Sequence, residues 1–227
     1  MHSKLALASA LVLIVSGAVL LFAMEYHNTL AHMSFWEKGL AAFFQSVTAR
    51  TAGFNTIDIG HLSNQGLFFL ILLMFIGGSS GSCAGGIKTG TFATMIVGGL
   101  SRLRGHETPQ VFRRSISSTS VVRANSVVII SAIVVVIAIL LLQVTELGSV
   151  DHCQTGGKFL ELCFEVVSAF GTVGLSTGVT SQLSLAGKLV VVVVMFVGRL
   201  GPLAVGLAVT RQKVARYKYA DESIMIG

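Results

Sequence analysis

Four long apolar segments constrain this chain more than any other feature of its sequence. They are Leu5–Met24, Leu62–Leu100, Val121–Thr145 and Leu183–Thr210. A membrane-spanning helix needs about 20 apolar residues, whereas the core of a signal peptide has about 7–15, so the first segment is predicted to be a retained transmembrane helix. Only 11% of the residues are charged, against about 25% in soluble domains. The sequence therefore predicts an all-α integral membrane protein.

Two shorter apolar segments lie between the long ones. Phe35–Val47 and Lys158–Phe170 have 13 residues each. A helix of that length is about 20 Å long, whereas the hydrocarbon core of a bilayer is about 30 Å thick. Both segments are therefore predicted to be re-entrant half-helices, which membrane proteins tolerate where they are buried in protein or line water.

The positive charges predict the orientation of the chain. Basic residues gather between the second and third long segments and again after the fourth. The positive-inside rule places both regions, and Lys4 at the N-terminus, in the cytoplasm of a multi-pass plasma (inner) membrane protein. Residues 106–120 are predicted to form a cytoplasmic interfacial helix that starts at Thr108-Pro109. Its arginines are interpreted as topology anchors in preference to a lipid or partner site.

The sequence contains an internal repeat at an offset of 121 residues. Thr51-Ala52-Gly53-Phe54 (the Thr51 segment) matches Thr172-Val173-Gly174-Leu175 (the Thr172 segment), and each follows a half-helix. We therefore predict two parallel repeats, residues 1–105 and 121–227. Each is composed of a transmembrane helix, a re-entrant pore helix, a filter loop and a second transmembrane helix.

The repeated unit has the physical properties of a cation filter. The C-terminal end of a half-helix carries partial negative charge, which favours a cation near the membrane centre. Glycine at Gly53 and Gly174 permits backbone conformations that turn carbonyl oxygens inward, and a ring of carbonyl oxygens replaces the hydration shell of K⁺. The predicted fold is therefore potassium-channel-like, with K⁺ bound by backbone carbonyls.

Longer motifs give the chain a family resemblance. They are "TARTAGFNTIDIGHLS" (Thr48–Ser63), "MFIGGSSGSCAGGIKTGTFA" (Met74–Ala93), "SAFGTVGLSTG" (Ser168–Gly178) and "MFVGRLGPLAV" (Met195–Val205). In these motifs the chain resembles the Trk/Ktr family of potassium uptake transporters, in particular the KtrB/TrkH membrane subunit. The resemblance implies K⁺ transport, with the Thr51 and Thr172 segments as the third and fourth filter segments.

The resemblance also implies a gate. In the family an intramembrane loop below the filter breaks the middle helix of this repeat, and Ser79–Lys88 matches that loop. The small residues of Ser79–Lys88 would let it lie in a water-filled vestibule. The implied gate residues are Ser79, Ser80, Gly81, Ser82, Gly85, Gly86, Lys88 and Arg199. Lys88 would lie near the ion path or extend to the inner membrane surface. Arg199 would lie in the pore below the filter, or pair with a carboxylate such as Glu165 or with a helix terminus.

The chain departs from the family in one respect, because family members have four repeats and this chain has two. It resembles the C-terminal half, and would need an N-terminal half or a second copy of itself to close a pore. The resemblance further implies a cytoplasmic ring of nucleotide-binding regulatory subunits and a dimer of pores. K⁺ is the expected transported ion, Na⁺ is a candidate coupling ion, and no cofactor is expected to bind this chain.

Two other functions compete with K⁺ transport. A non-conducting truncated or modulatory membrane subunit is the alternative. Gly77–Gly81 fits the G-x-S-x-G pattern of serine hydrolases, but the six histidines lie near predicted membrane boundaries or in loops. An intramembrane serine protease, which needs a histidine base, is therefore disfavoured, and no enzyme activity is expected.

The basic loops lack interleaved aromatic residues, which argues against nucleic acid as a binding partner. Asp58 is expected either to attract cations or to cap its loop.

Overall fold

The computed structural model describes most of the chain. The described residues are 2–79, 81–105, 109–111, 114–148 and 150–201. Ser80, a predicted gate residue, and the predicted cytoplasmic tail after residue 201 lie outside them.

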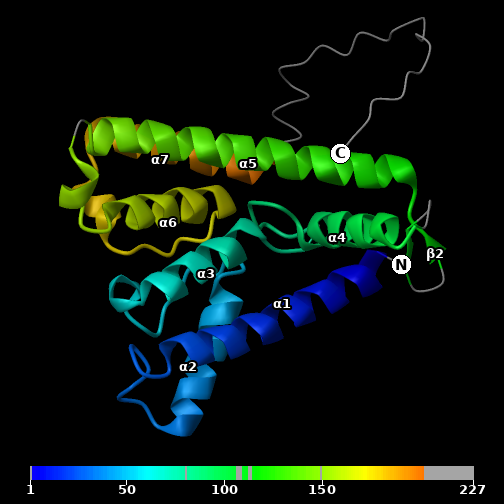
Figure 1. The fold of residues 1–227 in the computed structure, drawn as a ribbon, viewed down its shortest axis with the longest axis horizontal. Coiled ribbons are helices and arrows are strands. Elements are labelled where there is room, and N and C mark those ends of the chain that lie inside the picture. Colours follow the sequence, from blue (N-terminus) through cyan, green and yellow to red (C-terminus); the bar gives the residue numbers. More distant parts are fainter. Residues whose placement is uncertain (1, 80, 106–108, 112–113, 149, 202–227) are drawn as a thin grey trace, which may run out of the picture.

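Long apolar helices form the body of the molecule. In the described part of the chain, α1 (His2–Glu25) and α5 (Ser118–Glu146) are long and apolar enough to cross a membrane. At 1.5 Å per residue they are about 36 and 44 Å long. The helix α7 (Leu185–Leu200) packs along α5 (Figure 1). The predicted continuation of α7 to Thr210 lies outside the described residues.

The second long apolar segment is broken, as the glycine-rich stretch predicts. Helix α3 (Asn64–Phe75) ends there and α4 (Thr89–Leu103) begins after it. Between them, Ile76 and Ile87 form a parallel β-bridge, in which the Gly77 N–H donates to the Ile87 carbonyl over 2.8 Å. The bridge closes residues 76–88 into a compact loop, which we call the 76–88 loop.

The predicted interfacial helix over residues 106–120 is wrong for residues 109–111 and 114–117, whereas residues 118–120 belong to α5 (Ser118–Glu146). Gln110–Val111 (β1) and Arg114–Ser115 (β2) pair as antiparallel strands instead. The physical reason lies in Ser117, whose hydroxyl accepts the N–H of Ser120 and caps α5. Because the cap starts the long helix at Ser118, the residues before it are left to form a short hairpin.

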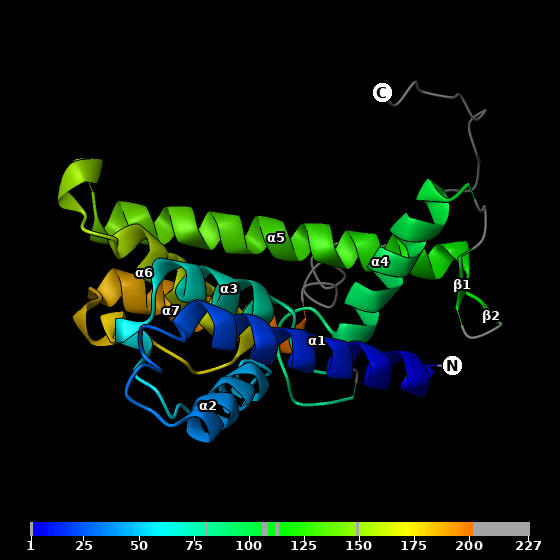
Figure 2. The ribbon, with the colours of Figure 1, turned by 60° about the horizontal axis from the view of Figure 1, so that its bottom comes forward.

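The half-helices occupy different places in the bundle. Helix α6 (Lys158–Gly171) packs against α3, α5 and α7, and the ring of its Phe170 stacks on Phe75 with 6.0 Å between centroids. Helix α2 (Phe35–Thr48) packs on α1 at the edge of the molecule (Figure 2). The short 3-10 helices η1 (Ile59–His61), η2 (His152–Gln154) and η3 (Val179–Gln182) lie in the connecting loops.

Candidate functional site

The candidate site begins at the ends of the two half-helices. Both helices have 14 residues, which is about 21 Å, so both are short, as predicted. A capping box fixes the start of α2, where the Ser34 N–H donates to the Glu37 carboxylate over 2.8 Å. This bond, together with the bond to the Ser34 side chain, holds the pKa of the Glu37 carboxyl below its usual value.

The Thr51 and Thr172 segments share an unusual backbone. Thr51 and Thr172 have φ values of 74° and 51°, in the left-handed region that β-branched residues rarely adopt. Gly53 and Gly174 follow with φ values of 78° and 91°. Strained backbone of this kind concentrates at functional sites, and here it recurs at both predicted filter segments.

The structure brings these two segments side by side. A Cβ atom added at Gly53 would lie 2.5 Å from the Val173 carbonyl oxygen, and one added at Gly174 would lie 3.6 Å from the Gly53 Cα. Any side chain at Gly53 would therefore collide with the neighbouring backbone. Glycine is required there both by its φ and by this close approach.

Two hydroxyls fasten the segments to their half-helices. The Thr48 hydroxyl accepts the Phe54 N–H over 3.0 Å and donates to the Phe54 carbonyl over 2.5 Å. The Ser168 hydroxyl donates to the Leu175 carbonyl over 2.6 Å. Sequence reasoning missed both anchors, although a hydroxyl residue in the last turn of each half-helix was a signal for them.

The chain that leaves the Thr172 segment is fastened to α6 as well. The Glu165 side chain, 6% exposed, accepts hydrogen bonds from the hydroxyls of Ser176, over 2.9 Å, and Thr180. Glu165 is therefore occupied by this loop rather than by Arg199. In α2, Gln45 is fully buried, and neither of its amide atoms has a partner among the described residues.

The 76–88 loop lies against the Thr172 segment. The Gly85 N–H donates to the Thr172 hydroxyl over 2.9 Å. Gly85 and Gly86 are buried, whereas Gly81 and Ser82 are exposed at the tip. The tip is turned by Ser82, whose N–H and hydroxyl both donate to the Ser79 carbonyl over 3.1 and 2.6 Å. Of the predicted gate residues in the loop, Gly85 and Gly86 thus lie beside one filter segment, whereas Gly81 and Ser82 lie at the exposed tip.

Both predicted gate cations bind the 76–88 loop. The half-buried Lys88 turns back and donates to the carbonyls of Ser82, over 3.3 Å, and Ala84. Arg199 reaches from α7 and donates to the Cys83 carbonyl. Neither the extension of Lys88 to the membrane surface nor the pairing of Arg199 with a carboxylate is the geometry observed.

Arg50 is a site residue that sequence reasoning missed. Its Nη1 donates to the Leu73 carbonyl over 3.2 Å and to the Ile76 carbonyl over 2.5 Å. These carbonyls end α3, where the helix dipole favours a cation. The sequence did contain a signal for a special role of Arg50. This arginine directly precedes the Thr51 segment, whereas the equivalent residue before the Thr172 segment is Gly171.

A carboxylate clamp recurs at the same offset as the filter segments. Glu25 accepts the N–H and hydroxyl of Ser63 over 3.1 and 2.5 Å. Glu146 accepts the N–H and hydroxyl of Ser184 over 3.1 and 2.6 Å. Ser63 caps α3 and Ser184 caps α7, and each of these helices is the first α-helix after a filter segment. The duplicated clamp supports the two-repeat organisation.

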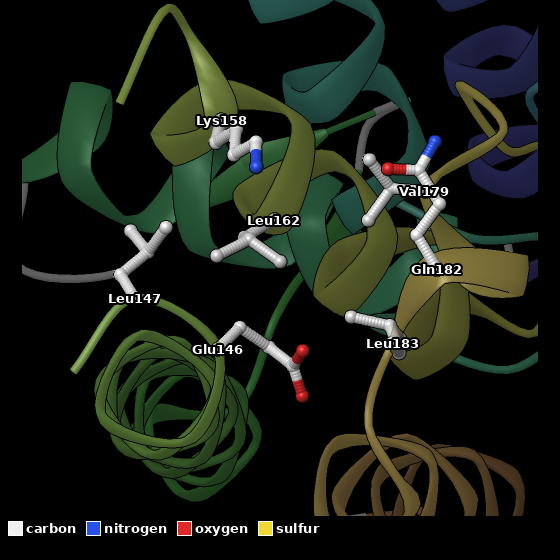
Figure 3. Close-up of a pocket in the computed structure, with 7 residues that line it drawn as sticks. All are labelled: Glu146, Leu147, Lys158, Leu162, Val179, Gln182 and Leu183. Atoms are coloured by element: carbon white, nitrogen blue, oxygen red, sulfur yellow. The ribbon is translucent and has the colours of Figure 1, made fainter. Parts of the chain in front are cut away.

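The Glu146 carboxylate also lines a cavity of about 140 Å³. Figure 3 shows it pointing between Leu162 of α6 and Leu183, which follows η3. Lys158 lines the same cavity from the start of α6. The cavity lies at the end of the bundle where α5 ends, away from the contact between the 76–88 loop and Thr172.

Asp58 caps the loop after the Thr51 segment. Its carboxylate accepts the Gly60 N–H over 2.9 Å and pairs with Nδ1 of His61 over 2.9 Å. The hydrogen bond with His61, and then the one from Gly60, lower the pKa of the Asp58 carboxyl. Of the two roles that the sequence left open, capping is the one the structure shows.

The described residues offer backbone oxygens rather than a side-chain metal site. Among them, no group of three or more His, Cys, Asp or Glu side chains is placed to hold a metal. Cys83, Cys153 and Cys163 are free thiols. Half-helices that end at apposed glycine loops, within a bundle of apolar helices, define a mostly helical membrane protein with a potassium-channel-like fold.

Comparison with known proteins identifies the family. The model of the TrkH family, described as a cation transport protein, matches residues 5–216, and the chain belongs to this family. It is 38% identical over 229 residues to Ktr system potassium uptake protein B of Bacillus subtilis, covering all of this chain and 49% of the relative. It is 39% identical over 231 residues to the potassium/sodium uptake protein NtpJ of Enterococcus hirae, covering all of this chain and 50% of the relative.

The solved structures agree on the fold. The crystal structure of the potassium transporter TrkH from Vibrio parahaemolyticus superimposes with a TM-score of 0.74 at 22% identity, covering 92% of this chain and 45% of that one. The chain thus spans about half the length of the relatives that it matches.

Proposed function

We propose that this chain supplies two of the four filter segments of a K⁺ uptake transporter of the Trk/Ktr type. The apposition of the Thr51 and Thr172 segments, with Gly53 against the Val173 carbonyl, carries the proposal. Each segment follows a half-helix whose C-terminal dipole favours a cation. The names of the relatives, which are potassium or potassium/sodium uptake proteins, support K⁺ as the cargo.

The proposed mechanism involves no covalent chemistry and no cofactor. K⁺ exchanges its hydration shell for backbone carbonyls of the filter segments and moves down its electrochemical gradient, with Na⁺ as a candidate coupling ion. The 76–88 loop acts as the gate, together with Arg199. Each segment has one glycine, whereas potassium channels have two in each filter segment. The filter is therefore expected to be less selective for K⁺ than that of a channel.

The proposed assembly has more components than this chain. An N-terminal half or a second copy supplies the other two filter segments, and two such pores form a dimer. Both termini lie in the cytoplasm, where the arginines from Arg102 to Arg123 and the C-terminal tail meet a ring of nucleotide-binding regulatory subunits. The basic character of this face supports the proposal.

Uptake of Rb⁺, a K⁺ surrogate, tests the function in cells that lack their own K⁺ uptake systems. The chain is expressed alone and together with the N-terminal half of a related transporter. Uptake only with the added half would mean that this chain supplies two of the four repeats of one pore. Uptake by the chain alone would mean that two copies of it close the pore. Uptake in neither arrangement would favour the non-conducting alternative.

The Gly174→Asp variant tests the filter assignment. We expect it to abolish uptake, because it places a charged side chain among the carbonyls at a φ of 91°. Gly156→Asp is the matched control, since Gly156 also has a positive φ and has open space around it in the loop before α6. Normal uptake by Gly174→Asp would refute the filter assignment.

A further inference from the structure

The two filter segments differ in what their threonine hydroxyls bind. The Thr172 hydroxyl accepts the N–H of Gly85 from the 76–88 loop over 2.9 Å. The Thr51 hydroxyl, at the equivalent position, donates to the Arg50 carbonyl over 2.5 Å. Both threonines have the same left-handed backbone, so the difference comes from the loop.

The contact between the loop and the Thr172 segment is a close approach of two backbones. A Cβ atom at Gly85 would lie 2.7 Å from the Thr172 hydroxyl oxygen and 3.0 Å from the carbonyl carbon of Gly171. A Cβ atom at Gly86, where φ is 67°, would lie 3.4 Å from the Gly171 Cα. Glycine at both positions lets the loop reach the hydroxyl, and a larger residue would push it away.

The rest of the loop is held from other directions. The bridge between Ile76 and Ile87 closes its base, Lys88 binds two of its carbonyls, and Arg199 binds a third from α7. The bond from Gly85 therefore fastens the loop to the filter, whereas the cations fasten its tip to the loop base and to α7.

We propose that the hydrogen bond between Gly85 and Thr172 is a latch that couples the position of the 76–88 loop to the Thr172 segment. While the bond is made, the loop stays beneath this segment and Thr172 keeps its left-handed conformation. When the loop leaves, Thr172 loses its partner and the segment is free to rearrange. Thr172 thus acts as a positioning residue for the gate, an inference that rests on the proposed function of the loop.

The mobility of the 76–88 loop can be measured by chemical modification of Cys83, because this thiol is exposed at the tip of the loop. In membrane vesicles with the Cys153→Ser change, which removes the other exposed thiol, a charged thiol reagent reports the mobility of the loop. We expect Thr172→Val to raise the rate of Cys83 modification about fivefold, as for the loss of one hydrogen bond. Thr172→Ser keeps the hydroxyl and should react at the original rate. Thr51→Val is the matched control and should also leave this rate unchanged.

A second variant keeps the test decisive if Thr172→Val folds poorly. Gly85→Ala should also accelerate modification, since its Cβ displaces the loop. If both single variants fold, the double variant should be less than additive, because both changes break one contact. A Thr172→Val protein with the original melting temperature and the original rate would overturn the latch, and so would equal acceleration by Thr51→Val. The rate of Cys83 modification tests the latch, and Rb⁺ uptake tests the proposed transport function. Because the two are measured separately, failure of one proposal can be distinguished from failure of the other.

Discussion

The two half-helices are alike in length but not in surroundings. Six residues of α2 are buried, against ten of α6, although each helix has 14 residues. Helix α6 packs against α3, α5 and α7, whereas α2 packs on α1. The same contrast reaches the filter segments, because Phe54 is 71% exposed and Leu175 is 3% exposed.

The difference shows that α6 is packed into the bundle more fully than α2. The exposed residues of α2 include Trp36, Leu40, Phe43 and Phe44, whose spacing places them on one face of the helix. An apolar face of this kind beside a filter segment is suited to packing against protein. We propose that the neighbouring pore segment of the assembled transporter covers it.

The largest expected effect separates one phenylalanine in each half-helix. Phe164 of α6 is fully buried and Phe44 of α2 is 39% exposed, and each lies four residues before the hydroxyl that anchors its filter segment. Phe164→Ala should lower the free energy of unfolding by about 3–5 kcal/mol. Phe44→Ala should cost less than about 1 kcal/mol, since it creates little buried cavity. Thermal unfolding in detergent measures both, and equal losses would remove the contrast.

Glu165 and Gln45 extend the comparison to polar groups, one residue further along each helix. Glu165→Leu leaves the hydroxyls of Ser176 and Thr180 without their acceptor, so we expect a loss of about 2–3 kcal/mol. Gln45→Leu removes two buried polar atoms that have no described partner, so it should be neutral or stabilising. The melting temperatures of the two variants should move apart. A marked destabilisation by Gln45→Leu would mean that the amide has a partner in the membrane.

A smaller difference is expected between the two carboxylate clamps. Glu25 is 1% exposed and also accepts bonds from Asn28 and Thr29, whereas Glu146 borders the cavity. Glu25→Gln should cost about 1–3 kcal/mol, because one of two buried oxygens that accept hydrogen bonds is replaced by an NH₂ group. Glu146→Gln should cost about 1 kcal/mol or less by the same comparison. Denaturation of the two variants under the same conditions measures which one loses more unfolding free energy. A larger loss in Glu146→Gln than in Glu25→Gln would contradict the prediction.

The smallest expected effect concerns pH. The pKa of Asp58 is lowered by His61 and Gly60, so its contribution to stability is present above the ordinary carboxyl pKa and is lost as the pH falls through the lowered value. The second repeat has Gln182 at the position of His61. His61→Ala should therefore raise the Asp58 pKa towards its ordinary value. An NMR titration of the Asp58 carboxyl measures it, and an unchanged pKa would exclude His61 as the cause.

The sequence was sufficient for the features that depend on local pattern. The lengths of the apolar segments predicted both half-helices, and the glycines of the 76–88 loop predicted the break between α3 and α4. The offset of 121 residues aligned the filter segments that the structure places side by side. In each case the signal lies within the segment itself.

Features that depend on packing were not predictable in this way. Arg50 and Lys88 bind backbone carbonyls, and which carbonyls are free depends on where α3 ends and how the 76–88 loop turns. The hairpin of β1 and β2 replaced the expected interfacial helix because α5 takes the last residues of that segment. The different burial of Phe44 and Phe164 also required the arrangement of the whole bundle.

The most direct test of the proposed ion path is to locate Rb⁺ in the assembled transporter. Anomalous diffraction from crystals grown in Rb⁺ would show each ordered ion. We predict a peak flanked by the backbone carbonyls of residues 51–54 and 172–175, and its loss in Gly174→Asp. Ordered Rb⁺ elsewhere in the protein, with none beside these two segments, would contradict the assignment of the filter.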